Sequence, residues 1–378
     1  MNPRFLEGIF MRYISIPYLQ EGMVLAQPIY GGKLEILLAQ GMALGRPHIQ
    51  RINDLGYPGV YIRDGQYLDI EARDIIPAEL RLRTIKAAKE ILTLAERGAI
   101  HKSGVKVSGK TNYKIIDPVI NAIISNKERR HDFIDIKPFD NYPYYHSANV
   151  TVLSLLIGVE LGLSGNQLYE LGLAALFHDV GNAFIPKEIL KKPGALANSE
   201  YETVKRHTEI GFEFLRGYFD IPIEACVGAL QHHENYDGTG YPNMLKEKKI
   251  SVYGRIISVA GVYDALMSRR PFRPFMFPPE ALGHIKLNAG TMFDPDIVNG
   301  LLRVVAIYPA GTCVELNTGV CCLVVKNYAD SPARPRLRLL DKKSRTPMYI
   351  DLYGNPVFAD IKIARLVEEG HISANVLS

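Results

Sequence analysis

The stretch at residues 231–242 constrains this chain more than any other part of the sequence. It reads Gln-His-His-Glu-Asn-Tyr-Asp-Gly-Thr-Gly-Tyr-Pro, so two adjacent histidines precede a glycine-rich turn. His146, His178 and His207 lie upstream, each in or beside a segment with a helical pattern. Half of the ten histidines of the chain therefore fall in one region. Histidines at the ends of several helices predict a helical bundle with a metal site in its core.

The overall composition excludes several classes of protein. A length of 378 residues allows two or three domains, each with its own core. The 44 basic and 40 acidic residues leave a net charge of +4, too balanced to indicate binding to a nucleic acid polymer or a membrane surface. We see no run of about 18 apolar residues, so no transmembrane helix is expected. The first residues lack the apolar core of a signal peptide.

The cysteines indicate a reduced compartment. There are four of them, at Cys226, Cys313, Cys321 and Cys322, and none forms a Cys-x-x-Cys pair. The adjacent Cys321 and Cys322 are poorly placed to bridge each other. The sequence therefore predicts a cytoplasmic chain with free thiols.

Changes in hydrophobic periodicity divide the chain into four regions. Residues 1–65 predict a small β-rich module, with strands near 13–16, 23–26, 35–38 and 59–62 and a helix at 48–55. No cluster of ionisable side chains is visible in this module, which favours a regulatory or docking role. Residues 66–125 predict a helical connector, and residues 306–378 a β-rich extension with strands at 312–316, 320–325 and 336–340. The expected fold class is mainly α, with small β regions at both ends.

The remaining region, residues 126–305, has an almost wholly helical pattern. Residues 145–163 predict a long helix with His146 near its start, and residues 167–177 a helix that leads into His178-Asp179. A capping box, Ser199-x-x-Glu202, predicts the start of the helix that carries His207. Two more helices are expected, one opening at Pro222 and running into His232, and one over residues 252–268.

The histidines matter as a set. A lone, partly buried histidine is more often a hydrogen-bonded core residue than a metal ligand. The joint pattern, a His-Asp pair closing one helix, a histidine on another and a His-His pair beside a glycine-rich turn, favours metal binding. Neutral imidazoles and a carboxylate suit divalent iron, manganese or zinc. Asp179 can bridge two ions, because a carboxylate has two oxygens, and two ions can clamp a phosphoryl group.

At these motifs the chain resembles the HD-GYP family, a branch of the HD metal-dependent phosphohydrolases. The resemblance covers about residues 140–300 and includes His178-Asp179, His232-His233 and the Gly-Tyr-Pro turn. The N-terminal module also resembles the small domain often found ahead of HD-GYP domains. The resemblance implies a helical HD-GYP bundle that holds one or two ions, iron or manganese, and hydrolyses cyclic di-GMP or a related cyclic dinucleotide.

The resemblance also implies individual roles. The metal ligands would be His146, His178, Asp179, His207, His232 and His233. The catalytic positions would be Asp179 and Asn182, and Gly240, Tyr241, Arg270 and Arg273 would contact substrate. Arginine suits phosphate binding, since its planar fork donates two parallel hydrogen bonds.

Three positions depart from the family pattern. Asn182 replaces a lysine that contacts phosphate. Gly261 replaces an aspartate that would bind the same metal as His178, while Asp264 survives in what is normally a structural place. Tyr142 stands where some members have a glutamate for a third metal, so a trinuclear site is not expected.

Two functions therefore remain open. The first is a cyclic dinucleotide phosphodiesterase with weakened activity. The second is a catalytically impaired protein that serves as a cyclic-dinucleotide receptor or a protein-interaction module. The five histidines favour the first, whereas Gly261 and Asn182 favour the second. A purely structural helical domain is a third and weaker reading. The sequence leaves open a signalling protein partner and a homodimer.

Overall fold

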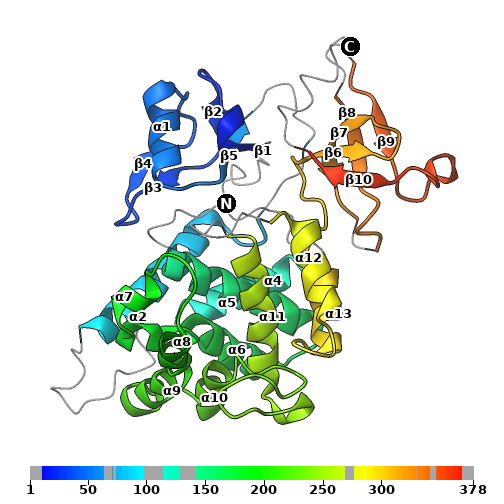
Figure 1. Cartoon of the computed structure of the whole chain (residues 1–378). Helices are drawn as coiled ribbons and strands as arrows, with labels where there is room; N and C mark the ends of the chain where they lie inside the picture. The colour runs from blue at the N-terminus through cyan, green and yellow to red at the C-terminus, as the bar shows by residue number, and fades with distance from the viewer. Residues whose placement is uncertain are drawn as a thin grey trace, which may run out of the picture.

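A bundle of helices forms the middle of the chain, and two small β regions lie beside each other against one end of it (Figure 1). The computed structural model describes residues 11–63, 70, 74–97, 114–127, 142–268, 276–328, 330–340 and 346–367. The predicted mainly helical fold with β regions at both ends is confirmed. Within the described residues, no helix combines the length and the apolar character needed to cross a membrane.

The N-terminal β region has its own small core. Its strands and helices are β1 (Arg12–Ser15), η1 (Ile16–Tyr18), β2 (Val24–Leu25), β3 (Ile29–Tyr30), β4 (Ile36–Leu38), α1 (Arg46–Asp54) and β5 (Gly59–Arg63). The strands form an antiparallel sheet in the order β1-β5-β2 and a hairpin of β3 with β4, of which β3 was not predicted. Ile14, Ile52 and Val60 are buried between this sheet and α1, whereas Tyr13 and Tyr61 belong to the core of the helical bundle.

The helical part is organised around one buried helix, α5 (Tyr142–Glu160). Every residue from 145 to 158 is buried, as expected of a helix that is surrounded by others. Its neighbours are α2 (Ala78–Glu96), α4 (Ile116–Ser125), α6 (Gly165–Phe177), α11 (Val252–Leu266) and α13 (Pro295–Val304). The remaining elements are η4 (Val180–Phe184), α7 (Lys187–Leu190), α8 (Asn198–Lys205), α9 (His207–Tyr218), α10 (Ile223–Leu230), η5 (Glu247–Lys249) and α12 (Pro278–Leu287).

The predicted capping box at Ser199 is wrong. Helix α8 has Ala197 at its N-cap, and the Glu200 carboxylate accepts a hydrogen bond from the Ala197 backbone N–H at 2.7 Å. Nζ of Lys192 forms an ion pair with Oε2 of Glu200 at 2.6 Å. Glu200 is therefore the side chain that caps the N-terminus of this helix. His207 does not lie on α8 either, because α8 ends at Lys205 and α9 begins at His207. The histidine therefore stands at a junction between two helices.

The C-terminal β region is a five-stranded antiparallel sheet in the order β10-β6-β7-β8-β9. Its elements are β6 (Cys313–Leu316), β7 (Cys321–Lys326), β8 (Arg336–Leu339), β9 (Tyr349–Asp351), η6 (Pro356–Phe358) and β10 (Ile363–Leu366). The 3-10 helix η6 lies just before the last strand, β10. Val314, Val324 and Leu337 fill its own core, while Cys313 and Leu323 pack onto the core of the bundle. All four cysteines are free.

Candidate metal centre

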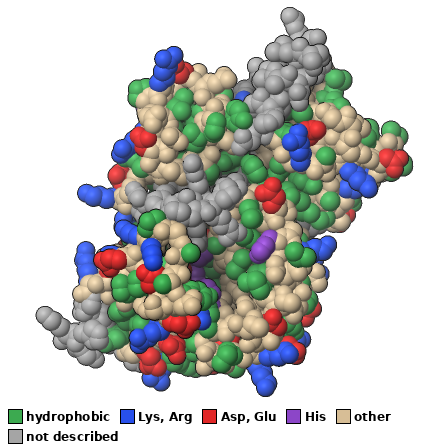
Figure 2. Space-filling view, viewed as in Figure 1, with side chains coloured by type: hydrophobic (Ala, Val, Ile, Leu, Met, Phe, Trp, Pro, Cys, Tyr) green, Lys and Arg blue, Asp and Glu red, His purple; other side chains and the backbone are tan. Residues whose placement is uncertain are grey.

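Five histidines and Asp179 gather on one side of the bundle, where histidine side chains are visible at the floor of a hollow (Figure 2). They form two sets that share Asp179. The four-ligand group is Asp179, His207, His232 and His233, and the three-ligand group is His146, His178 and Asp179. Within each group, one ligand atom per residue lies within 4.8 Å of all the others. The structure thus brings together all six residues that the sequence suggested as metal ligands.

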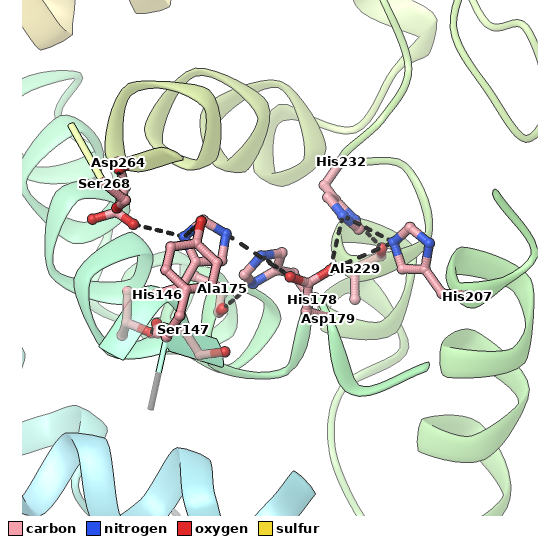
Figure 3. Close-up of polar contacts among 12 residues, drawn as sticks. His146, Ser147, Ala175, His178, Asp179, His207, Ala229, His232, Asp264 and Ser268 are labelled. Atoms are coloured by element: carbon pink, nitrogen blue, oxygen red, sulfur yellow. Dashed lines mark hydrogen bonds and ion pairs between the residues drawn. The ribbon is translucent and has the colours of Figure 1, made fainter. Parts of the chain in front are cut away.

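Asp179 lies between the two groups and turns one oxygen toward each (Figure 3). Its Oδ1 is 3.5 Å from Nε2 of His207 and 3.8 Å from Nε2 of His232. Its Oδ2 is 3.4 Å from Nε2 of His178 and 3.8 Å from Nε2 of His146. This is the arrangement that a carboxylate bridging two ions requires.

Three of the histidines are oriented by the ends of the preceding helices. In each, ring Nδ1 donates to a backbone carbonyl three residues earlier: His178 to Ala175 (2.8 Å), His207 to Val204 (2.6 Å) and His232 to Ala229 (2.7 Å). These carbonyls belong to the last turns of α6, α8 and α10, where the regular i to i−4 hydrogen bonds of a helix run out. A carbonyl can only accept, so in the neutral ring Nδ1 carries the proton and Nε2 has a lone pair for a metal.

His146 is oriented differently, because it lies within α5 rather than after a helix. Its Nδ1 is 2.6 Å from Oδ2 of Asp264 on α11. Tyr142 stacks on the imidazole, with ring centroids 5.2 Å apart and an angle of 16° between the planes. The carboxylate accepts a hydrogen bond from Nδ1–H and leaves Nε2 facing Asp179. Asp264 therefore has the supporting place expected from the sequence. The sequence analysis did not predict the stacking of Tyr142 on His146.

Gly181 explains how Asp179 reaches His207. A Cβ atom on Gly181 would lie 1.8 Å from the carbonyl oxygen of His207 and 2.9 Å from the backbone N of Gly211. Only glycine lets the 3-10 helix η4 pack directly on the start of α9. Asn182, the next residue, donates its backbone N–H to the carbonyl of Asp179 at 3.0 Å. Asn182 therefore lies in the short turn that follows Asp179, and its catalytic role stays a prediction.

The Gly-Tyr-Pro turn packs against the ligand His233. A Cβ on Gly240 would lie 2.1 Å from the backbone N of Asn235, so this position also requires glycine. The N–H of Tyr241 donates to the carbonyl of His233 at 3.1 Å, and the two rings stack with centroids 4.8 Å apart. Tyr241 thus holds His233 in place, a role that the sequence reasoning missed when it assigned this residue to substrate alone.

Burial controls the electrostatics of the histidines. It lowers the pKa of His146 and His207, lowers that of His232 further, and lowers the pKa of His233 to about 3. Neighbouring imidazoles add to the effect at His232 and His233. The desolvated histidines of the four-ligand group are therefore neutral at pH 7, the form in which imidazole binds a metal.

His178 and Asp179 shift each other's pKa values. Burial pushes the pKa of His178 down, but the Asp179 charge and the hydrogen bonds to Asp179 and Ala175 outweigh it, and the pKa of His178 is raised. Burial would raise the pKa of Asp179, but its histidine neighbours, His178 foremost, hold it well below its usual range. The carboxylate is thus ionised and available as a ligand.

One departure from the family pattern, Gly261, lies on the helix that supports His146 through Asp264. Gly261 is on α11, one turn before Asp264. Apart from the backbone of that helix, no described atom lies within 4 Å of the place where its Cβ would stand, so a side chain has room there. Arg270 and Arg273 lie outside the described residues.

Comparison with known proteins matches residues 112–297 to a family described as HD domain. The chain is 32% identical over 238 residues to a cyclic di-GMP phosphodiesterase of Pseudomonas aeruginosa, covering 62% of this chain and 56% of that protein. It is 41% identical over 150 residues to the cyclic di-GMP phosphodiesterase response regulator RpfG of Xanthomonas campestris pv. campestris, covering 39% of each.

A third relative has a different named substrate. It is the 3'3'-cGAMP-specific phosphodiesterase 3 of Vibrio cholerae, 35% identical over 169 residues, with 44% of this chain and 36% of that protein covered. The chain spans 56% of the length of the first relative and less than half of the other two. The match includes the helices that carry both ligand groups.

Proposed function

We propose that this chain, whose residues 112–297 match the HD domain family, is a metal-dependent phosphodiesterase that hydrolyses cyclic di-GMP or a related cyclic dinucleotide. The resemblance to the HD-GYP branch is confirmed by the family match and by relatives named as cyclic di-GMP phosphodiesterases. The observation that carries the proposal is the placement of Asp179, which turns one oxygen to each of two histidine groups.

The donor set fits divalent metal ions. His207, His232 and His233 with Asp179 would hold one ion, and His146 and His178 with the same carboxylate would hold a second. Bound ions would polarise a phosphoryl group and lower the pKa of a water molecule, which is the chemistry needed to hydrolyse a phosphodiester. Iron or manganese remains our prediction for the metal, on the basis of the mixed imidazole and carboxylate ligands.

The chain's own residues prepare this centre before any substrate arrives. Backbone carbonyls and Asp264 hold the imidazoles with Nε2 directed inward. Tyr241 packs on His233 and lies at the edge of the site, where we propose that it and Gly240 meet the substrate. We also propose that Arg270 and Arg273, which follow α11, neutralise phosphate charge.

Turnover should be slow. The three-ligand group lacks the carboxylate that Gly261 removes, and Asn182 brings no positive charge to the phosphate. Loss of a group that supports a metal or a phosphate costs about 10–100-fold in affinity or rate. Because both losses act on the same transition state, their effects need not add.

The test is hydrolysis of cyclic di-GMP and of 3'3'-cGAMP by purified protein supplied with Mn²⁺ or Fe²⁺. We expect slow formation of linear product, abolished in the double variant His232→Ala/His233→Ala. His284→Ala is the matched control, because this exposed histidine lies on α12 away from the ligand groups. Product formation that persists in the double variant would contradict the proposal.

Gly261 and Asn182 favour a second function, that of a receptor which binds the cyclic dinucleotide without cleaving it. Saturable binding of cyclic di-GMP with no linear product under either metal would support the receptor. A signalling protein partner, a homodimer and a cytoplasmic location remain predictions, and the four free cysteines support the last of them.

A further inference from the structure

A line of polar side chains runs through the bundle from His146 to the start of α2. Asp264 Oδ2 is 2.6 Å from His146 Nδ1, and its Oδ1 accepts a hydrogen bond from Asn149 Nδ2 at 3.1 Å. The Oδ1 atom of Asn149 accepts from Arg81 Nη1 at 3.0 Å. Arg81 in turn donates through Nε and Nη2 to the two oxygens of Asp74, each at 2.6 Å. Three helices, α2, α5 and α11, thus contribute to one connected chain.

The members of this chain are buried where apolar residues would be expected. Arg81 is 9% exposed, Asn149 3% and Asp264 4%. A buried polar group that lacks a partner is destabilising, and each member supplies a hydrogen-bond partner to the next one. Replacing the set by apolar residues of similar volume would cost the bundle little stability. Packing alone therefore does not explain why the chain of polar groups is present.

The hydrogen bonds of the chain have a fixed direction. A guanidinium can only donate, so the oxygen of the Asn149 amide must face Arg81 and its NH₂ group must face Asp264. Asp264 then offers its other oxygen to the Nδ1 proton of His146. The proton is thereby kept on Nδ1, and Nε2 stays free on the side of Asp179.

We infer that Arg81 and Asn149 are positioning residues for His146, setting the tautomer of this imidazole through Asp264 and so preparing the three-ligand group for its metal. The inference rests on the proposed metal site. It applies to His146 in particular, because His178, His207 and His232 donate Nδ1 to backbone carbonyls instead. Asp74 anchors the chain at its far end by holding Arg81 with two hydrogen bonds.

Two variants interrupt this series of hydrogen bonds without replacing a metal ligand. Arg81→Met removes the donor that orients the amide, and Asn149→Leu replaces the amide by an apolar side chain of nearly the same shape. Arg255→Met is the matched control. Arg255 and Asp294 form another Arg–Asp pair of the bundle, with side chains 13% and 1% exposed, against 11% and 14% for Arg81 and Asp74. All three variants should lose stability, but only the first two should affect His146.

The first measurement needs no metal. In protein labelled with ¹⁵N in histidine, long-range ¹H–¹⁵N spectra report which ring nitrogen carries the proton, and the His146 signal is the one missing from His146→Gln. We expect the Nδ1–H form in the natural chain and in Arg255→Met. Arg81→Met and Asn149→Leu should give a mixture of both tautomers.

The second measurement is a titration with Mn²⁺. We expect the affinity for the ion of the three-ligand group to fall about 10-fold in Arg81→Met and in Asn149→Leu, while the ion of the four-ligand group binds as before. Unchanged tautomer and affinity relative to Arg255→Met would overturn the inference. If the natural chain binds no metal but the tautomer still shifts in both variants, the proposed function fails and the positioning role stands. Should Arg81→Met not fold, Asn149→Leu decides the same point.

Discussion

The two ligand groups share Asp179 but orient their histidines by different means. In the four-ligand group, His207 and His232 donate to carbonyls three residues earlier in the chain. In the three-ligand group, His146 depends on Asp264, 118 residues away in the sequence. Local geometry forms whenever the helix end forms, whereas the distant contact requires that the bundle be assembled. Substitutions far from the site can therefore change the histidine orientation in the three-ligand group more readily than in the four-ligand group.

The groups also differ in number of ligands. One group combines three histidines with Asp179, while the other has two histidines and the same carboxylate, with Gly261 in place of a further aspartate. We therefore expect one tight and one weak ion. The following predictions test this difference, beginning with the largest effect.

Asp179→Asn should abolish the difference in metal affinity between the two groups, because neither group should then retain its ion. The substitution keeps the shape of the side chain but takes away the charge that faces four imidazoles. Affinity for both ions should fall by more than about 100-fold, which exceeds the usual loss of a residue that only supports a ligand. Metal content after dialysis checks this. Retention of one equivalent of metal would show that one group does not need Asp179.

His232→Ala and His146→Ala should act on different ions. His232→Ala should weaken the tight ion by about 100-fold, because a ligand of the complete group is lost. His146→Ala should affect only the weak ion. Mn²⁺ titrations of both variants, with His284→Ala as the control, measure this. Equal effects of the two ligand variants on the tight ion would mean that the groups are not separate sites.

Gly261→Asp should reduce the difference in metal affinity between the two groups, because it adds a ligand to the three-ligand group. Among the described residues, none outside α11 comes within 4 Å of a Cβ at this position, and a non-glycine residue in the middle of α11 should not destabilise the helix. We expect the weak ion to bind about 10-fold more tightly and hydrolysis of cyclic di-GMP to rise, further so with Asn182→Lys. Gly261→Asn is the control, because it has the same size without the charge. If Gly261→Asn behaves like Gly261→Asp, the effect is not due to a new ligand.

Proton binding should distinguish the groups in metal-free protein. The pKa of His233 is about 3 in the folded chain and about 6.5 when unfolded, so its contribution to stability is complete above pH 6.5 and is lost as the pH falls. The pKa of His178 is raised, so its contribution is complete below pH 6.5 and is lost as the pH rises through the folded value. The two residues therefore have opposite effects on acid stability.

Urea unfolding in the presence of a chelator, between pH 7.5 and 5.5, measures this. Acidification should destabilise His233→Gln less than the natural chain, and His178→Gln more, with slopes that differ by up to about 1 kcal/mol per pH unit. The same slope in both variants would contradict the assignment of opposite pKa shifts.

The sequence alone determined the helical bundle, the β regions at its ends and the six candidate ligands. Periodicity and capping are local properties, so they can be read from neighbouring residues. The orientation of His178, His207 and His232 is local too, since a histidine just after a helix end can reach the carbonyl three residues back. Local signals were ambiguous in α8, where the carboxylate of Glu200 rather than that of Glu202 caps the start of the helix, and strand β3 gave no signal that predicted it.

Only the tertiary structure decided how these residues meet. It determined which oxygen of Asp179 faces which histidine, and that Asp264, Asn149 and Arg81 stand behind His146. It also showed that Gly181 must be glycine because α9 lies against it, whereas no described residue outside α11 comes within 4 Å of a Cβ placed on Gly261. The physical reason is that such contacts join residues far apart in the chain. Their distances depend on how whole helices pack, and no local pattern of residue types records that packing.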